Sequence, residues 1–253
     1  MDNTNAGVCT IAIAGCDVTF ASYEERLRMV DAALAVPEER TRIGYANAHT
    51  IVSACKDGRF RAALSCLSIV FADGAGVYAA ASHINRAGMR HQPTQNATDF
   101  NERILEYADA RRLRLFLVGG TDEVIGRSVE LVAARYPGIL LAGVQNGYFD
   151  PADPSVIDRI NAAGPQLVLV GMGHPVQELW IQAHSGALQA ALVIAVGGFF
   201  DFFSGRHARA PLFMRRLRLE WLHRLLLEPR RLWKRYVVGI PHFFYIVGRG
   251  EKK

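Results

Sequence analysis

The first residue of this chain that could do chemistry is a carboxylate that directly follows an apolar run. Asp73 stands in Phe71-Ala72-Asp73-Gly74, directly after a short apolar run. A carboxylate at the end of a strand and beside a glycine can accept a proton from a bound hydroxyl. An aspartate at this position could instead cap the helix expected from Gly76, and spacing alone favours the cap.

A second candidate segment runs from Gly171 to Glu178 and reads Gly-Met-Gly-His-Pro-Val-Gln-Glu. Pro175 suits the first turn of a helix, which places Gln177 and Glu178 in that turn. Gln177 could bond an amide-like base or a sugar hydroxyl, whereas Glu178 could simply favour the helix dipole. His174 could act as a base, but a lone loop histidine is usually solvated, so we do not select it.

Small or polar residues end several of the expected strands. They include Asn47, Gly74, Gly119, Gly120, Gly171 and Gly173. Ligands of open α/β sheets bind at the carboxyl ends of the strands, where glycines let a phosphate approach the backbone. The same glycines could merely turn tight corners, and no GxGxxG fingerprint accompanies them.

Alternating strands and helices must position these residues. Short apolar runs predict buried strands at residues 11–14, 43–46, 115–118, 167–170 and 192–196, with weaker candidates at 68–71 and 139–144. Helices are expected at residues 22–35, 50–55, 76–85, 99–110, 122–135, 155–163 and 175–185. The pattern predicts an α/β fold with a Rossmann-like open, mostly parallel sheet and helices on both faces.

Charge is distributed unevenly along the chain. The 253 residues carry a net charge of +5, but 13 of the 29 Lys and Arg residues and only 3 of the 24 Asp and Glu residues lie from Gly205 onward. This tail therefore carries +10 and the remainder −5, which favours a nucleic acid, an anionic membrane or a phosphorylated ligand as partner. The hydrophobic content of 50% excludes a disordered or fibrous chain. Four cysteines without a CxxC pair indicate reduced thiols.

The tail reads as an amphipathic helical appendage. Leu217, Trp221 and Leu225 fall near one helix face, and arginines supply charge around them, a pattern typical of anionic membrane interfaces. The helix could also pack on the domain or bind nucleic acid. We expect residues 1–204 to form the core and 205–253 the appendage. The N-terminus does not resemble a signal peptide, and the apolar runs 187–200 and 236–247 are too short to span a bilayer, which predicts a peripheral protein.

Ordered motifs over nearly the whole chain resemble the WecG/TagA/CpsF glycosyltransferases, glycosyltransferase family 26. The matching elements are Asn47-Ala48-His49, Ala72-Asp73-Gly74, Leu117-Val118-Gly119-Gly120, Tyr136-Pro137, Asn146-Gly147-Tyr148-Phe149, the Gly171 to Glu178 segment, Gly197-Gly198-Phe199-Phe200-Asp201-Phe202, Gly205, Arg209-Ala210-Pro211, Leu219-Glu220-Trp221-Leu222-His223-Arg224-Leu225 and Glu228-Pro229. The ordered set, above all its C-terminal run, is specific.

The resemblance implies an inverting, metal-independent transfer of a sugar from a UDP-sugar to a saccharide linked to undecaprenyl diphosphate, without a cofactor. It implies Asp73 as general base, Gln177 in the substrate site, and Arg224, Arg231 and Lys234 closing over the donor diphosphate. The other expected substrate-binding residues are Asn47, Gly74, Gly119, Gly120, Gly171, Gly173 and Glu178. The protein would work in the cytoplasm at the inner face of the membrane, in cell-surface polysaccharide synthesis.

Three positions depart from the family pattern: Tyr45 and Thr94 replace a usual threonine and arginine, and Val176 replaces the lysine of Pro-Lys-Gln-Glu. The donor therefore stays open between UDP-ManNAc, UDP-ManNAcA, UDP-glucose and another UDP-hexose. The body could form homo-oligomers, and no nucleic acid is expected. The alternative is a non-catalytic nucleotide- or nucleic-acid-binding protein that uses the basic tail. An NAD-type oxidoreductase is a weaker third option, because the glycine fingerprint is missing.

Overall fold

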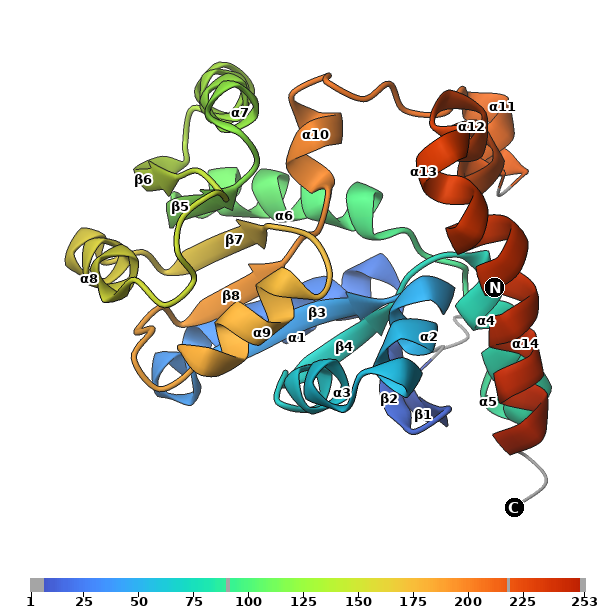
Figure 1. Ribbon diagram of the computed structural model, residues 1–253. Helices are drawn as coiled ribbons and strands as arrows, with labels where there is room; N and C mark the ends of the chain where they lie inside the picture. Colours follow the sequence, from blue (N-terminus) through green and yellow to red (C-terminus); the bar gives the residue numbers. More distant parts are fainter. Residues whose placement is uncertain (1–6, 90–91, 218, 251–253) are drawn as a thin grey trace, which may run out of the picture.

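Eight strands form one sheet in the computed structural model, which describes residues 7–89, 92–217 and 219–250 (Figure 1). The strands are β1 (Cys9–Ile13), β2 (Cys16–Phe20), β3 (Thr41–Ala46), β4 (Ile69–Ala72), β5 (Arg114–Gly119), β6 (Leu140–Gln145), β7 (Leu167–Gly171) and β8 (Leu192–Ala195). Their order is β1-β2-β4-β3-β8-β7-β5-β6, and every pair except β1–β2 is parallel. The predicted open, mostly parallel α/β sheet is confirmed.

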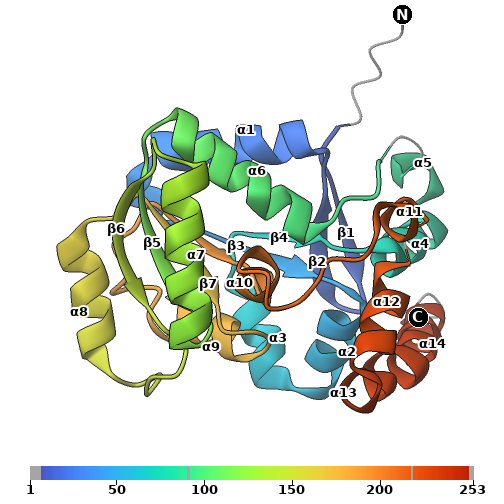
Figure 2. The ribbon, with the colours of Figure 1, turned by 90° about the horizontal axis from the view of Figure 1, so that it is seen from above.

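Helices cover both faces of the sheet (Figure 2). In chain order they are α1 (Tyr23–Ala35), the 3-10 turn η1 (Pro37–Glu39), α2 (Ala48–Lys56), α3 (Gly58–Ser65), α4 (Ala75–Ile84), α5 (Arg86–Met89), α6 (Ala97–Ala110), α7 (Asp122–Arg135), α8 (Pro154–Ala163), α9 (Val176–Ala183) and α10 (Phe199–Phe203). Side chains of α2, α3, α4, α8 and α9 share one core cluster, and side chains of α1, α6, α7 and α10 share another.

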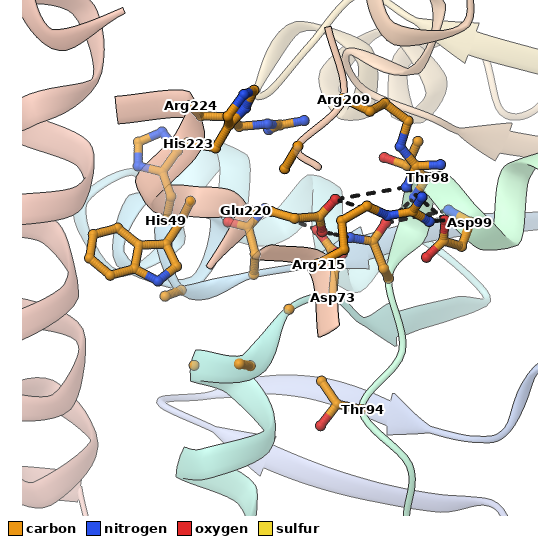
Figure 3. A pocket seen from close by; sticks show the side chains of 18 of the residues that line it. His49, Asp73, Thr94, Thr98, Asp99, Arg209, Arg215, Glu220, His223 and Arg224 are labelled. Atoms are coloured by element: carbon orange, nitrogen blue, oxygen red, sulfur yellow. Dashed lines mark hydrogen bonds and ion pairs between the residues drawn. The ribbon is translucent and has the colours of Figure 1, made fainter. Parts of the chain in front are cut away.

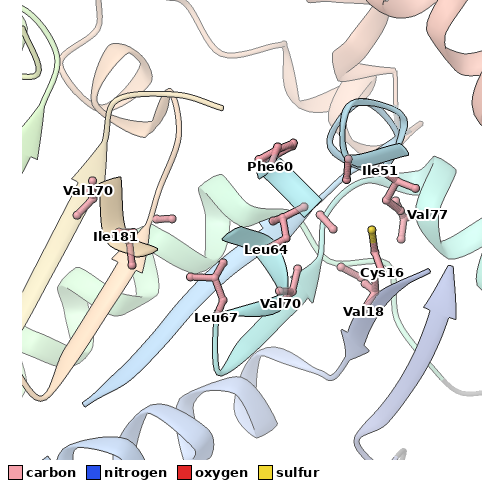
Figure 4. Packing of buried hydrophobic residues seen from close by; sticks show 14 of the residues in the cluster. Cys16, Val18, Ile51, Phe60, Leu64, Leu67, Val70, Val77, Val170 and Ile181 are labelled. Atoms are coloured by element: carbon pink, nitrogen blue, oxygen red, sulfur yellow. The ribbon is translucent and has the colours of Figure 1, made fainter. Parts of the chain in front are cut away.

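Side-chain alternation along the central strands separates these two clusters. In β7, Val168 and Val170 join the first cluster, whereas Leu167 and Leu169 join the second. All four are fully buried, as expected for parallel strands with helices on both sides. Figure 4 shows the first cluster, in which Phe60 and Leu64 of α3 pack over the sheet.

The N-terminal edge of the sheet contains its one antiparallel pair among the described strands. β1 and β2 form an antiparallel hairpin, and the sequence analysis missed β2. Ala14 and Gly15, both with positive φ (51° and 79°), form the two-residue turn that this hairpin geometry requires. The helix α3 was missed as well, although Asp57 caps it by accepting hydrogen bonds from the backbone N–H groups of Arg59 and Phe60.

The C-terminal residues form a further column of helices beside the sheet (Figure 1). They are α11 (Leu212–Arg216), α12 (Glu220–Leu227), α13 (Pro229–Trp233), a π-helical turn η2 (Lys234–Val238) and α14 (Gly239–Gly250). Helix α14 packs against α2 and α4, where Phe243 and Val247 are buried in the first core cluster. The division into a core up to residue 204 and an appendage from residue 205 stays a prediction. Within the described residues, no helix is both long and apolar enough to cross a bilayer.

Candidate functional site

Two adjoining cavities lie where the C-terminal column meets the carboxyl ends of the strands. The tail cavity, of about 540 Å³, lies between the ends of β3 and β4, the start of α6 and the C-terminal helices. The strand-end cavity, of about 660 Å³, extends over the ends of β5, β7 and β8. The connections after β3 and β5 run to opposite edges of the sheet, and such a reversal is where open α/β sheets bind ligands.

Asp73 belongs to the wall of both cavities, and Figure 3 shows it in the tail cavity. Its backbone N–H donates to the carbonyl of Ala46 (2.9 Å), which ties it to the end of β3. Its Oδ1 accepts a hydrogen bond from the N–H of Ala97 (2.9 Å), the first residue of α6. The cap that spacing favoured is therefore wrong, because the N-cap of α4 is Gly74 and carries no side-chain cap bond. Asp73 instead supports the start of a different helix.

Asn47 lies next to Asp73. Its Oδ1 caps α2 by accepting from the N–H and the hydroxyl of Thr50 (3.1 and 3.2 Å). This bonding turns Nδ2 toward Asp73, where it lies 3.5 Å from Oδ2. Oδ2 is thus the carboxylate oxygen with the weaker bond, and it is the oxygen available to a ligand hydroxyl.

Glycines line the strand-end cavity as expected, with one exception. Gly120, Gly171 and Gly173 contribute to its wall, and Gly74 lines the tail cavity. Gly119 lies outside both walls: a Cβ there would come within 2.3 Å of the Gly171 carbonyl oxygen. Its φ of 138° and this close approach require glycine, so Gly119 lets the ends of β5 and β7 pass each other.

Gln177 and Glu178 are fully buried beneath the strand-end cavity. The Gln177 Oε1 accepts from the backbone N–H groups of Gly173 (3.3 Å) and Gly197 (3.0 Å), which joins the loops after β7 and β8. Its Nε2 donates to Glu178 Oε1 (2.7 Å), and the same oxygen lies 2.6 Å from Nδ1 of His174. Gln177 therefore shapes the loops, while His174, the histidine set aside from sequence, lines the cavity.

The tail supplies cations to the site, though not all that were predicted. Arg224 lines both cavities and lies over the Phe202 ring (4.2 Å). Lys234 is exposed and lines neither cavity, whereas the next residue, Arg235, lines both. Lys234 was assigned by the spacing of the family motif, and both residues lie in the π-helical turn Lys234–Val238. Arg231 lies in α13, and its side chain is outside the described part of the structure.

An ionic cluster joins the tail to α6 at the tail cavity (Figure 3). Asp99 pairs with Arg209 (2.6 Å) and Arg215 (2.7 Å), and both arginines also approach Glu220 (3.8 and 3.9 Å). Burial raises the pKa of Glu220 above its usual range, and Arg209 partly offsets this effect. The sequence analysis assigned no role to this cluster, although Arg209 and Glu220 belong to the recognised motifs.

His49 is a neutral side chain in a positive environment. It lines both cavities, and burial together with Arg235, His174 and Lys56 lowers its pKa from 6.5 to about 4. A neutral imidazole can both accept and donate hydrogen bonds at neutral pH. His49 therefore adds a polar contact to the site without adding charge.

Comparisons with known proteins match the chain over the same elements. A family model described as "Glycosyl transferase WecG/TagA/CpsF family" matches residues 11–253. An N-acetylglucosaminyldiphosphoundecaprenol N-acetyl-beta-D-mannosaminyltransferase of Bacillus spizizenii is 34% identical over 207 residues, which cover 82% of this chain and 78% of that protein. A protein of the same name from Staphylococcus aureus is 33% identical over 186 residues, 74% of this chain and 71% of its own.

The low pKa of His49 makes folding stability depend on pH. Between pH 6.5 and about 4 the unfolded chain binds a proton at His49 that the folded chain does not, so stability falls as the pH decreases through this window. Across this pH window, we expect the free energy of unfolding of His49→Gln to fall by about 1–2 kcal/mol less than that of the wild type. This value is smaller than the full pKa shift would give, because the ring is only partly buried and solvent screens its charge. Urea unfolding at both pH values measures this. An equal loss in both proteins would contradict it, and His184→Gln serves as control.

The buried carboxylate of Glu178 should stabilise the fold. Glu178→Gln keeps the side-chain shape but weakens the contacts to His174 and Gln177. We therefore expect the free energy of unfolding to decrease by about 1–3 kcal/mol. Thermal unfolding should show a midpoint several degrees lower. The exposed Glu130, which pairs with Arg127 on the same helix, provides the matched control. If Glu178→Gln and Glu130→Gln both unfold at the wild-type temperature, the hydrogen bonds of Glu178 do not stabilise the loops after β7 and β8.

Proposed function

The chain belongs to the WecG/TagA/CpsF family of glycosyl transferases, as its motifs predicted, and we propose that it moves a hexose or N-acetylhexosamine from a UDP-sugar to a saccharide linked to undecaprenyl diphosphate. The names of the two relatives support this choice, because they specify an N-acetylmannosaminyl group and an N-acetylglucosaminyl-diphosphoundecaprenol acceptor. The product would be part of a bacterial cell-surface polysaccharide.

The observation that carries the proposal is the position of Asp73 in the wall shared by the two cavities. A group transfer needs a donor and an acceptor on either side of one reacting carbon. With the donor nucleotide in the strand-end cavity and the acceptor sugar in the tail cavity, the acceptor hydroxyl would meet Asp73 Oδ2. The hydrogen bond that this oxygen accepts from Asn47 Nδ2 is long (3.5 Å), so an acceptor hydroxyl can compete with Asn47 for it.

The proposed reaction is a single displacement. Asp73 takes the proton of the acceptor hydroxyl while its oxygen bonds to the anomeric carbon of the donor. The bond between that carbon and the phosphate oxygen breaks on the opposite face, and UDP leaves with the electron pair. This geometry inverts the anomeric centre.

The leaving diphosphate needs positive charge, which arginines can supply without a metal. Arg224 and Arg235 both line the strand-end cavity, where the glycine loops also expose backbone. Arg224 is the predicted diphosphate ligand that the cavity contains, and Arg235 takes the position that sequence assigned to Lys234. We propose that these two arginines stabilise the UDP leaving group.

The protein is proposed to act at the cytoplasmic surface of the membrane, where a lipid-linked acceptor would be found. Several apolar side chains of the C-terminal column are exposed, among them Phe213 (63%), Leu217 (64%) and Leu226 (69%). Apolar side chains next to many arginines favour an anionic lipid interface. The acceptor's prenyl chain would then stay in the bilayer during transfer.

Removing the Asp73 carboxylate should abolish catalysis and spare binding. We expect Asp73→Asn to lower the rate of UDP release about 10²–10⁴-fold, because the amide cannot accept the hydroxyl proton. UDP affinity, measured by calorimetry, should stay near the wild-type value. The control is Asp150→Asn, because that carboxylate accepts a hydrogen bond from the N–H of Ala152 within a turn and lines neither cavity. A fully active Asp73→Asn protein would remove Asp73 as the base.

Two exposed tail residues test the membrane proposal. Replacing Phe213 and Leu217 by serine should weaken binding to vesicles that contain phosphatidylglycerol by about tenfold or more, since apolar area is lost. The matched control replaces Leu140 and Leu141 of β6, which are also exposed (42% and 38%) but lie outside the C-terminal column. Sedimentation with vesicles gives the bound fraction. Unchanged binding of the tail variant, or an equal loss in the control, would contradict a membrane role for this surface.

A further inference from the structure

A third cavity, of about 690 Å³, lies beside the proposed active site. One of its walls is α2, and the other is formed by α13, η2 and the start of α14. These elements stand next to each other in Figures 1 and 2, and α14 packs directly on α2. The proposed reaction has so far given this cavity no role.

The charge on this cavity has one sign. Its lining includes Lys56 on one wall and Lys234 and Arg235 on the other, and no carboxylate is among the described residues that line it. Asp57, next to Lys56 in sequence, uses its carboxylate to cap α3. The positive charge of Arg235 and Lys56 also acts on His49, since it contributes to the lowering of the His49 pKa. An opposed set of cations without local acids suits a multiply charged anion.

The same cavity has an apolar side. Val52, Leu232, Trp233 and Val238 contribute to its lining, and Lys234 lies 5.8 Å from the Trp233 ring. Trp233 and Val238 are 46% and 53% exposed, so the apolar side opens to the surface. A ligand that fits both halves must join an anionic group to a hydrocarbon chain.

The third cavity adjoins the two cavities of the proposed active site. His49 and Arg235 line all three cavities, so a ligand in the third cavity would lie next to the site that contains Asp73. In the acceptor that the relatives' names specify, the diphosphate joins the sugar to the prenyl chain. The attacking hydroxyl is on another carbon of that sugar. One sugar ring therefore separates the hydroxyl from the diphosphate.

We propose that this cavity is the subsite for the polyprenyl diphosphate of the acceptor. Lys56 and Lys234 bind the diphosphate, and Trp233 and Val238 contact the first isoprene units. The assignment rests on the proposed function and deepens it. It gives Lys234 a phosphate to bind, but that of the acceptor instead of the donor.

Binding of a soluble probe tests the subsite without any sugar transfer. Geranylgeranyl diphosphate should change the tryptophan fluorescence of the full chain, and Trp233→Phe should remove most of that change. Replacing Lys56 and Lys234 together by alanine should weaken binding about tenfold or more, and replacement of both by arginine should restore it. The control is Arg59→Ala, since that side chain is 88% exposed and outside the cavity. Equal affinity of the alanine variant and the wild type would overturn the proposal.

A membrane phospholipid offers the same chemistry, and a second measurement separates the two sources. If the cavity serves the acceptor, the alanine variant keeps its affinity for phosphatidylglycerol vesicles within about twofold. Loss of vesicle binding with unchanged geranylgeranyl diphosphate affinity would assign the cations to phospholipid and overturn the subsite.

A transfer assay distinguishes failure of the subsite from failure of the proposed function. The alanine variant should raise the KM for a prenyl-diphosphate-linked acceptor about tenfold, with the KM for the UDP-sugar unchanged. Transfer with an unchanged acceptor KM overturns the subsite and keeps the function. Probe binding in a wild-type protein that transfers no sugar supports the subsite and contradicts the function.

Discussion

The hydrogen bond from the N–H of Ala97 to the Asp73 carboxylate joins the end of β4 to the start of α6, and the arrangement of the site depends on it. Together with the bond from Asp73 N–H to the Ala46 carbonyl, it fixes the carboxylate at the centre of the sheet's carboxyl edge. One carboxylate oxygen is thereby committed to structure, and the other faces the cavities. Because Asp73 is held from both sides, its carboxylate stays in the wall that the two cavities share.

The C-terminal column forms the walls of the two cavities that the sheet leaves open. The sheet offers glycine loops, a carboxylate and the buried Gln177 and Glu178 that join two loops, but the arginines that line the cavities come from outside it. The ionic cluster of Asp99 with Arg209 and Arg215 fastens the column to α6. The charge asymmetry of the sequence thus becomes a spatial one, with a mildly acidic body and a basic wall that together enclose the site.

Most of the sheet could be predicted from the sequence, because strands buried on both faces consist of continuous apolar runs, as in β7 and β8. The strand β2, which lies between β1 and β4, was missed because Cys16-Asp17-Val18-Thr19-Phe20 mixes polar and apolar residues and so lacks a continuous apolar run. Asp73 follows a buried strand, as expected, but its partner lies 24 residues away at Ala97, and no local pattern shows that contact. Arg235 was not selected, because the family motif assigns by spacing and does not show which side chain of the turn lines a cavity.

In the proposed reaction, donor and acceptor meet at Asp73 from two different cavities. A crystal structure with UDP and a non-reactive prenyl-diphosphate sugar would locate both substrates. We expect UDP in the strand-end cavity beside Arg224, and an acceptor hydroxyl within about 3.2 Å of Asp73 Oδ2. An acceptor hydroxyl that contacts His174 instead, or a nucleotide bound in the tail cavity, would contradict it.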